Sequence, residues 1–176
     1  MPNASGTGVS VTITNYSTVA FKTPPNAPQL GSSTLIDTNG SFLVDAFYQN
    51  GHIWVAANGG CVPAGDSKTR SCLRLVELNV AGAPSVAQDL TFGEKGEYYY
   101  YPAIREGSGG NLVAVFNRSS ATEYVGVYAS GQLASAPNTF QVPTLVKSGE
   151  TSYTISPPRW GDYSGASRDP LTTNMV

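Results

Sequence analysis

Short apolar runs separated by turn residues constrain the fold of this chain more than any other feature. Apolar and β-branched residues cluster in runs such as "HIWVAA" and "LVAVF", and Gly, Pro, Asn or Asp interrupts them. Helical periodicity is nearly absent, whereas short runs of this kind are typical of strands. The pattern predicts an all-β fold with strands near 9–15, 41–48, 52–57, 72–80, 86–91, 98–104, 111–117, 123–129, 139–146, 151–155, 163–167 and 173–176.

An internal repeat accompanies these runs. The segment "FLVDAFYQNGHIWVAANGG" (42–60) aligns with "YYYPAIREGSGGNLVAVFNRSS" (99–120), and a third copy begins at "YSGASRDPLTTNMV". Trp54, Val113 and Met175 occupy comparable places, so the period is close to sixty residues. In the first two copies a third strand and an outer strand follow. Four strands at this period are the layout of a β-propeller blade.

The repeat divides the chain into four parts. These are an N-terminal segment with the remnant of a preceding blade (1–40), two blade-like repeats (41–98 and 99–158) and the start of a third (159–176). Closed propellers usually have four to eight blades, so about three blades leave the propeller incomplete. Val176 is expected inside a strand, and an unpaired strand edge there invites association. We therefore expect completion by oligomerisation or by further blades of a larger parent chain.

The composition and the net charge exclude some classes of binding partner. Charged residues are only 12% of the chain, and ten Lys and Arg against twelve Asp and Glu give a net charge of −2. This balance provides no basic face for a nucleic acid. No apolar run is long enough to span a membrane. The neutral polar residues predict an extracellular or cell-surface protein, and "MPNASGTG" lacks signal-peptide features, so a leader is expected outside this chain.

The two cysteines flank a polar loop in "GGCVPAGDSKTRSC". Cys61 and Cys72 stand at the base of a predicted hairpin, where two cysteines can face each other at disulfide distance. Two buried free thiols are the alternative. A zinc site is not predicted, because one histidine, His52, cannot complete four ligands. A disulfide would place the chain in an oxidising compartment. No metal or cofactor is predicted.

The segment "PPRWGDYSGASRDP" (157–170) is the most chemically crowded part of the chain. As a structural corner, its aspartates would close turns, Arg159 would pair with a carboxylate and Trp160 would pack as an apolar wedge. As a binding site, it would face the channel at the start of an inner strand. The candidate binding residues here are Arg159, Trp160, Asp162 and Tyr163.

Four successive tyrosines in "EYYYYPA" (97–103) offer a second candidate. Because side chains alternate along a strand, Tyr98 and Tyr100 are expected on one face and Tyr99 and Tyr101 on the other. One pair would enter the core. The other, taken here as Tyr99 and Tyr101, could line a groove and stack on sugar faces. Carbohydrate and other proteins are therefore the expected partners.

Three pieces of the sequence carry a resemblance to a known family. "NGHIWVAANGGC", "YYYPAI…GNLVAVFNRSS" with "TEY", and "PRWGDYSGASRDP" resemble secreted bacterial β-propeller proteins similar to the sialidase-like (BNR, or Asp-box) propellers. The likeness runs from about residue 42 to the C-terminus, and R-W-G-D-Y-S-G followed by D-P is its most specific element. It implies a propeller fold and secretion. The arginine triad, tyrosine–glutamate pair and aspartate acid of sialidases cannot be placed here.

Two functions are compatible with these observations. The first is a non-catalytic propeller segment that serves as a binding or scaffold module. The second is part of a sialidase-like glycoside hydrolase whose other catalytic residues lie outside this chain. Paired carboxylates across a channel would mark the hydrolase, and Asp162, Asp169, Asp45 and Glu97 are the candidates. No catalytic residue is assigned, since His52 is the only histidine and no G-x-S-x-G motif is present.

Overall fold

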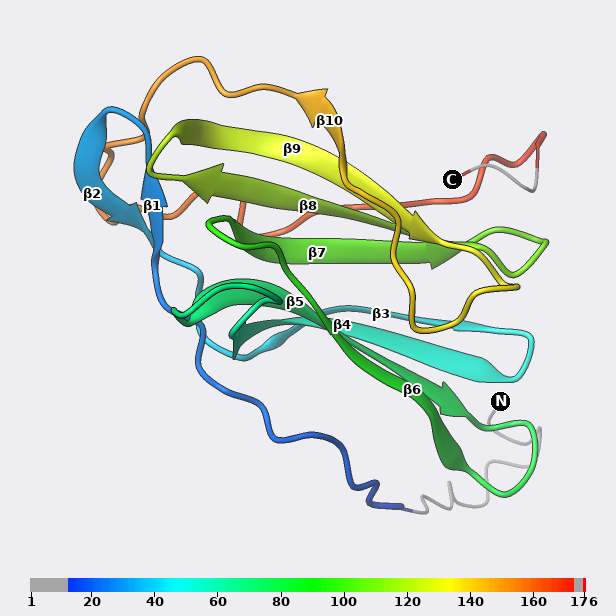
Figure 1. Ribbon diagram of the computed structural model, residues 1–176. Coiled ribbons are helices and arrows are strands. Elements are labelled where there is room, and N and C mark those ends of the chain that lie inside the picture. Colours follow the sequence, from blue (N-terminus) through cyan, green and yellow to red (C-terminus); the bar gives the residue numbers. More distant parts are fainter. Residues whose placement is uncertain (1–12, 173–175) are drawn as a thin grey trace, which may run out of the picture.

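The computed structural model describes residues 13–172 and 176, and in this part of the chain it contains strands but no helix (Figure 1). The predicted all-β class is confirmed. No helix of the described residues could cross a membrane. The strands are β1 (Ala27–Gln29), β2 (Ser32–Ile36), β3 (Leu43–Gln49), β4 (His52–Cys61), β5 (Arg70–Asn79), β6 (Ser85–Phe92), β7 (Tyr98–Glu106), β8 (Leu112–Ser120), β9 (Glu123–Gln132) and β10 (Thr144–Lys147).

Two four-stranded antiparallel sheets dominate the molecule. Their strand orders are β3-β4-β5-β6 and β7-β8-β9-β10, so each sheet is a simple meander of consecutive strands. Figure 1 shows the two sheets stacked, with the β1–β2 hairpin at one end. The first sheet lies within the predicted repeat 41–98, and the second begins at the boundary with the next repeat. The described residues form no closed propeller.

Turn chemistry sets the register of the first hairpin. Gln49 pairs with His52, so the β3–β4 turn has two central residues. These are Asn50 and Gly51, and both have positive φ, 51° and 84°. An Asn-Gly pair at positive φ matches the twist of the flanking strands. The register that follows places alternate side chains of β4 against the second sheet.

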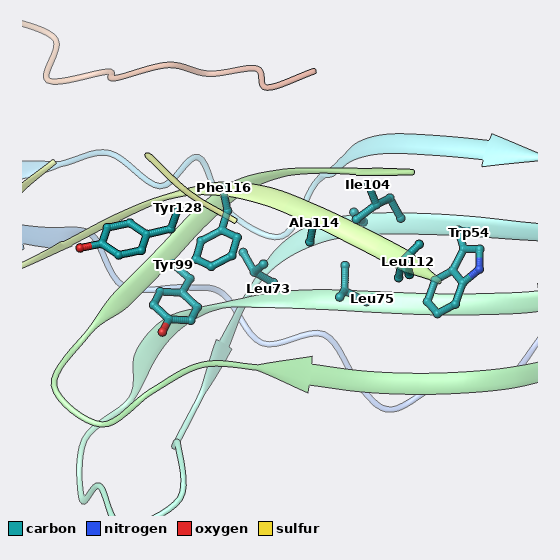
Figure 2. Close-up of a cluster of buried hydrophobic side chains, with 10 residues drawn as sticks. Trp54, Leu73, Leu75, Tyr99, Ile104, Leu112, Ala114, Phe116 and Tyr128 are labelled. Carbon is teal, nitrogen blue, oxygen red and sulfur yellow. The ribbon is translucent and has the colours of Figure 1, made fainter. Parts of the chain in front are cut away.

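The hydrophobic core lies between the two sheets. In Figure 2 it extends from an aromatic group of Tyr99, Phe116 and Tyr128 to Trp54 at the other end. The Phe116 ring lies 4.7 Å from the Tyr99 ring, centroid to centroid. Burying each large side chain contributes about 1.5–3 kcal/mol. The remaining core residues come from β4, β5, β7 and β8 and are Ala56, Leu73, Leu75, Ile104, Leu112 and Ala114.

Two extended segments partly cover the outer faces of the sheets. On the first sheet, Gly60 donates its N–H to the Lys22 carbonyl at 2.7 Å. The Arg74 side chain donates through Nη2 to the Val19 carbonyl at 3.3 Å. On the second sheet, the chain from Pro158 onward passes over β7 and β8, where Trp160 donates to Asn117 and Ser164 donates to the Tyr101 carbonyl. Each sheet is thus packed on its neighbour by one face and partly covered on the other.

Several predicted strands differ from the structure. The hairpin β1–β2 was not predicted, because each strand is short and Pro28 and Gly31 lie in it. The predicted strand 139–146 is reduced to β10, since Pro143 cannot donate to a ladder. The predicted strands 151–155 and 163–167 are wrong, and residues 13–15 and Val176 are in no strand. The rest of predicted strands 9–15 and 173–176 lies outside the described residues.

Candidate functional site

Tyr101 stands at the centre of the corner that "RWGDYSG" forms. Its backbone N–H donates to Asn58 Oδ1 at 2.6 Å, and its hydroxyl donates to the Asp37 carbonyl at 2.8 Å. Its own carbonyl accepts a hydrogen bond from Ser164 Oγ at 2.8 Å. Tyr101 is fully buried and has a φ of 54°. One residue therefore joins four segments that are far apart in the sequence.

Arg159 and Asp162 form the polar part of this corner. Arg159 Nη2 lies 2.5 Å from Asp162 Oδ2. The other carboxylate oxygen, Oδ1, is buried and has no hydrogen-bond partner in the described part of the chain. Burial raises the pKa of the Tyr101 hydroxyl, and the nearby Asp162 carboxylate raises it further. Asp162 thus places a buried carboxylate oxygen at the corner, close to the Tyr101 hydroxyl.

Trp160 connects the corner to an apolar groove. Its indole Nε1 donates to Asn117 Oδ1 at 3.3 Å, and its ring meets the Tyr153 ring at 5.4 Å and 76°. The groove has a volume of about 350 Å³ and is lined by these two aromatic residues, by 125–127 and by 147–152. Apolar grooves of this size with aromatic walls are typical of small-ligand sites.

The other two candidate tyrosines lie apart from this groove. Tyr99 is fully buried in the core between the sheets, where burial raises the pKa of its hydroxyl. Tyr163 is 83% exposed. The prediction that Tyr99 and Tyr101 share one face is wrong, because they belong to different clusters. The register of β7 shifts between Tyr100 and Ala103, and the positive φ at Tyr101 breaks the alternation.

The predicted disulfide is confirmed. Cys61 and Cys72 are bridged across the β4–β5 hairpin, with their Cα atoms 5.9 Å apart. Within the enclosed loop, Asp66 accepts hydrogen bonds from Arg70 Nε at 2.8 Å and from the Gly96 N–H at 3.0 Å. The Arg70 guanidinium and the Gly96 N–H lower the pKa of the Asp66 carboxyl. The loop is therefore tied to the β6–β7 connection as well as to its own hairpin.

A second charged cluster, which sequence reasoning missed, surrounds Arg118 on β8. Its Nε lies 2.8 Å from Glu123 Oε2 and 3.8 Å from Glu97 Oε2, and its Nη1 lies 3.6 Å from Glu94 Oε2. The guanidinium stands 3.8 Å from the centre of the Tyr128 ring. Burial raises the pKa of Glu97, and burial followed by the Glu123 hydrogen bond raises the pKa of Tyr128 to about 12.

Two of the four candidate hydrolase carboxylates pair with different arginines. Glu97 lies beside Arg118, whereas Asp162 pairs with Arg159. In residues 13–172 and 176, no group of three or more His, Cys, Asp or Glu side chains could hold a metal ion. No local motif marks the Arg118 cluster in the sequence, because its acids come from the β6–β7 connection and from β9.

Comparison with protein-family models, with curated proteins and with solved structures found no match. No relative therefore assigns a role to any residue of the corner, the groove or the Arg118 cluster.

Proposed function

We propose that this chain is a non-catalytic, extracellular binding module of the β-propeller type, whose ligand is carbohydrate. One observation carries this proposal: Asn58 and Asn117, which occupy equivalent places in the repeat, each accept a hydrogen bond from a residue of the next repeat. The sialidase-like resemblance of the sequence agrees with this reading. The disulfide and the low content of charged residues suit an oxidising, extracellular location.

The recurring contact involves equivalent residues of the repeat. Asn58 on β4 accepts the Tyr101 N–H. Asn117, at the equivalent place on β8, accepts the Trp160 indole N–H, and its Nδ2 lies 3.4 Å from where a Cβ on Gly161 would stand. Tyr101 and Gly161 have similar positive φ values, 54° and 56°, and Gly40 ahead of β3 has 68°. Each of the two repeats is thus linked to the following one through an asparagine at the equivalent place.

The side-chain directions agree with blades arranged in a ring. Trp54 on β4 points into the core and so faces the second sheet. Its equivalent, Val113 on β8, lies between the core residues Leu112 and Ala114 and therefore points to the opposite face. In a propeller, equivalent residues of successive blades face successive neighbours. Val113 is then the residue that would face a third blade.

The groove beside Trp160 is the proposed carbohydrate contact. Trp160 and Tyr153 supply aromatic surface, Asp162 and Arg159 supply hydrogen-bonding groups nearby, and Tyr163 lies exposed on the same segment. A sugar ring presents an apolar face and polar edges, which suits aromatic walls with a polar rim.

Binding of the full chain to immobilised β-glucans, chito-oligosaccharides and sialylated glycans tests this function. We expect binding to at least one class, and we expect Trp160→Ala to weaken it by about tenfold or more, as loss of one aromatic stacking contact would. Tyr48→Ala is the matched control, because Tyr48 is an exposed aromatic residue on the first sheet. Absence of binding to all three classes, or equal binding by both variants, would contradict the proposal. Thermal unfolding of each variant verifies that it is folded.

The scaffold part of the proposal predicts self-association. Val142, Leu145 and Val146 are exposed beside and on the edge strand β10, and apolar edges of this kind pair with other strands. Light scattering on the full chain is expected to give a mass near twice 18.4 kDa or a higher multiple. Val146→Lys is expected to shift the mass toward the monomer. A wild-type monomer at every concentration measured would refute self-completion.

A further inference from the structure

A second hollow lies between the two sheets, away from the Trp160 groove. It has a volume of about 240 Å³ and lies where the β3–β4 turn, the β7–β8 turn and the end of β9 come together, at the right in Figure 1. Trp54 closes the core at this end (Figure 2). We call this hollow the inter-sheet cleft, and its polar lining includes His52, Glu77, Gln88, Glu106 and Gln132.

A chain of hydrogen bonds fixes the orientation of two amides in the cleft. Gln88 Nε2 donates to Glu77 Oε2 at 2.7 Å. Gln88 Oε1 accepts both the backbone N–H of Asn138 at 2.8 Å and Gln132 Nε2 at 2.9 Å. A carboxylate can only accept and a backbone N–H can only donate, so neither amide can be turned around. The remaining atom of the Gln132 amide must therefore be its oxygen.

That oxygen is an acceptor without a donor. Gln132 is only 4% exposed, and its Oε1 is buried with no hydrogen-bond partner in the described residues. Buried polar groups in folded proteins are almost always hydrogen-bonded, and an exception calls for a physical reason. Here the amide lines an open cleft, so a ligand could supply the missing donor.

The carboxylates of the cleft indicate the charge of such a ligand. Glu106 is 8% exposed and accepts a hydrogen bond from Gln49 Nε2 at 3.2 Å, but it is in no ion pair of the described chain. Glu77 Oε1 lies 2.8 Å from His52 Nδ1. Among the described residues, no lysine or arginine lines the cleft. Two nearly buried carboxylates and a free amide oxygen together form an acceptor-rich and negatively charged lining.

We infer that the inter-sheet cleft binds the protonated primary amine of a small ligand. An ammonium group carries three donors and one positive charge, so it can donate to Gln132 Oε1 and supply the counter-charge that Glu106 lacks. A neutral hydroxyl group would satisfy the amide oxygen but would leave Glu106 without a counter-charge. This inference does not depend on carbohydrate binding at Trp160, because the two sites share no residue.

Titration of the full chain with glucosamine, glucose and n-butylamine tests the inference. Binding is followed by calorimetry and by the side-chain amide NMR signals of Gln88 and Gln132. We expect both protonated amines to bind at least about tenfold more tightly than glucose, and to bind more weakly as salt is added. If glucosamine exceeds n-butylamine, an amino sugar is recognised, and if the two are equal, the ammonium group alone is recognised. Equal binding of glucose and glucosamine, or no amine binding, would overturn the inference.

A charge-removing variant separates a binding role from a structural one. Glu106→Gln keeps the shape and is expected to reduce glucosamine affinity by about tenfold or more. Glu94→Gln is the control, since Glu94 is a partly exposed glutamate that pairs with Arg118 and lines neither the cleft nor the Trp160 groove. Equal glucosamine affinity in the two variants would also reject the inference. Trp160→Ala is expected to retain amine binding, so failure at the groove and failure at the cleft are distinguishable.

Discussion

Replacing Asn58 by alanine is expected to lower the free energy of unfolding by about 2–6 kcal/mol. Asn58 is fully buried, donates through Nδ2 to the Thr38 carbonyl at 2.7 Å and accepts the Tyr101 N–H at 2.6 Å. Alanine leaves both backbone groups buried without partners, and each costs roughly 1–3 kcal/mol. Against a total stability of about 5–15 kcal/mol, this loss is severe. Urea unfolding should show a lower midpoint at an unchanged m-value.

Asn111→Ala provides the matched control for this result. Asn111 also accepts a backbone N–H, from Ala134 at 2.9 Å, but at an exposed position where water can replace it. Its substitution should change the stability by no more than about 0.5–1 kcal/mol. Equal losses in the two variants would show that the buried amide does not hold the corner together.

Asn58 and Asn117 show how much of a residue's role could be predicted from the sequence. In the repeat, Asn58 and Asn117 appear as polar residues at the ends of equivalent strands, a place where a side chain usually ties down a turn. In the structure each reaches across to the next repeat instead. The sequence therefore marks the right residues, but their partners are 43 residues away and depend on how the sheets stack.

The sheets themselves were largely predictable. β3 to β9 follow the apolar runs because turn residues such as Asn50-Gly51 set where each run reverses. β4 extends beyond the predicted end at residue 57 to Cys61, through "NGGC", which has little intrinsic strand preference. Pairing with β5, the disulfide and the Gly60 N–H bond to Lys22 hold this extension. Tertiary contacts override local preference there.

The binding surfaces were less predictable, for a physical reason. The corner around Tyr101 combines Asp37, Asn58 and Asp162, and the inter-sheet cleft combines Gln88 with Gln132. The residues that meet at each of these two places are far apart in the sequence. Each depends on which faces of two sheets meet, and a single positive φ at Tyr101 was enough to move Tyr99 and Tyr101 to different clusters. The alternation of side chains along a strand does not by itself predict which residues of the facing sheet a side chain contacts.

Reduction of the Cys61–Cys72 disulfide is expected to cost about 2–3 kcal/mol of stability. The bridge closes a loop with a sequence separation of 11, and constraining a loop of this size in the unfolded chain stabilises the folded state by nearly 3 kcal/mol. The folded loop is also pinned by Asp66, whose hydrogen bonds to Arg70 and Gly96 persist without the bridge. The loss should therefore come mainly from the unfolded chain. The urea midpoint with and without dithiothreitol measures it.

The double variant Cys61→Ala with Cys72→Ala separates the bridge from other effects of the reductant. The urea midpoint of this variant should match that of the reduced wild type, apart from the small loss of stability caused by removing two packed sulfur atoms. Dithiothreitol should leave the midpoint of the variant unchanged. A wild-type midpoint that does not move on reduction would mean that the hairpin pairing alone fixes the loop, and would remove the main structural support for an extracellular location. A shift of the expected size would mean that the fold gains much of its margin from an oxidising environment, because domain stabilities are only a few times larger than this contribution.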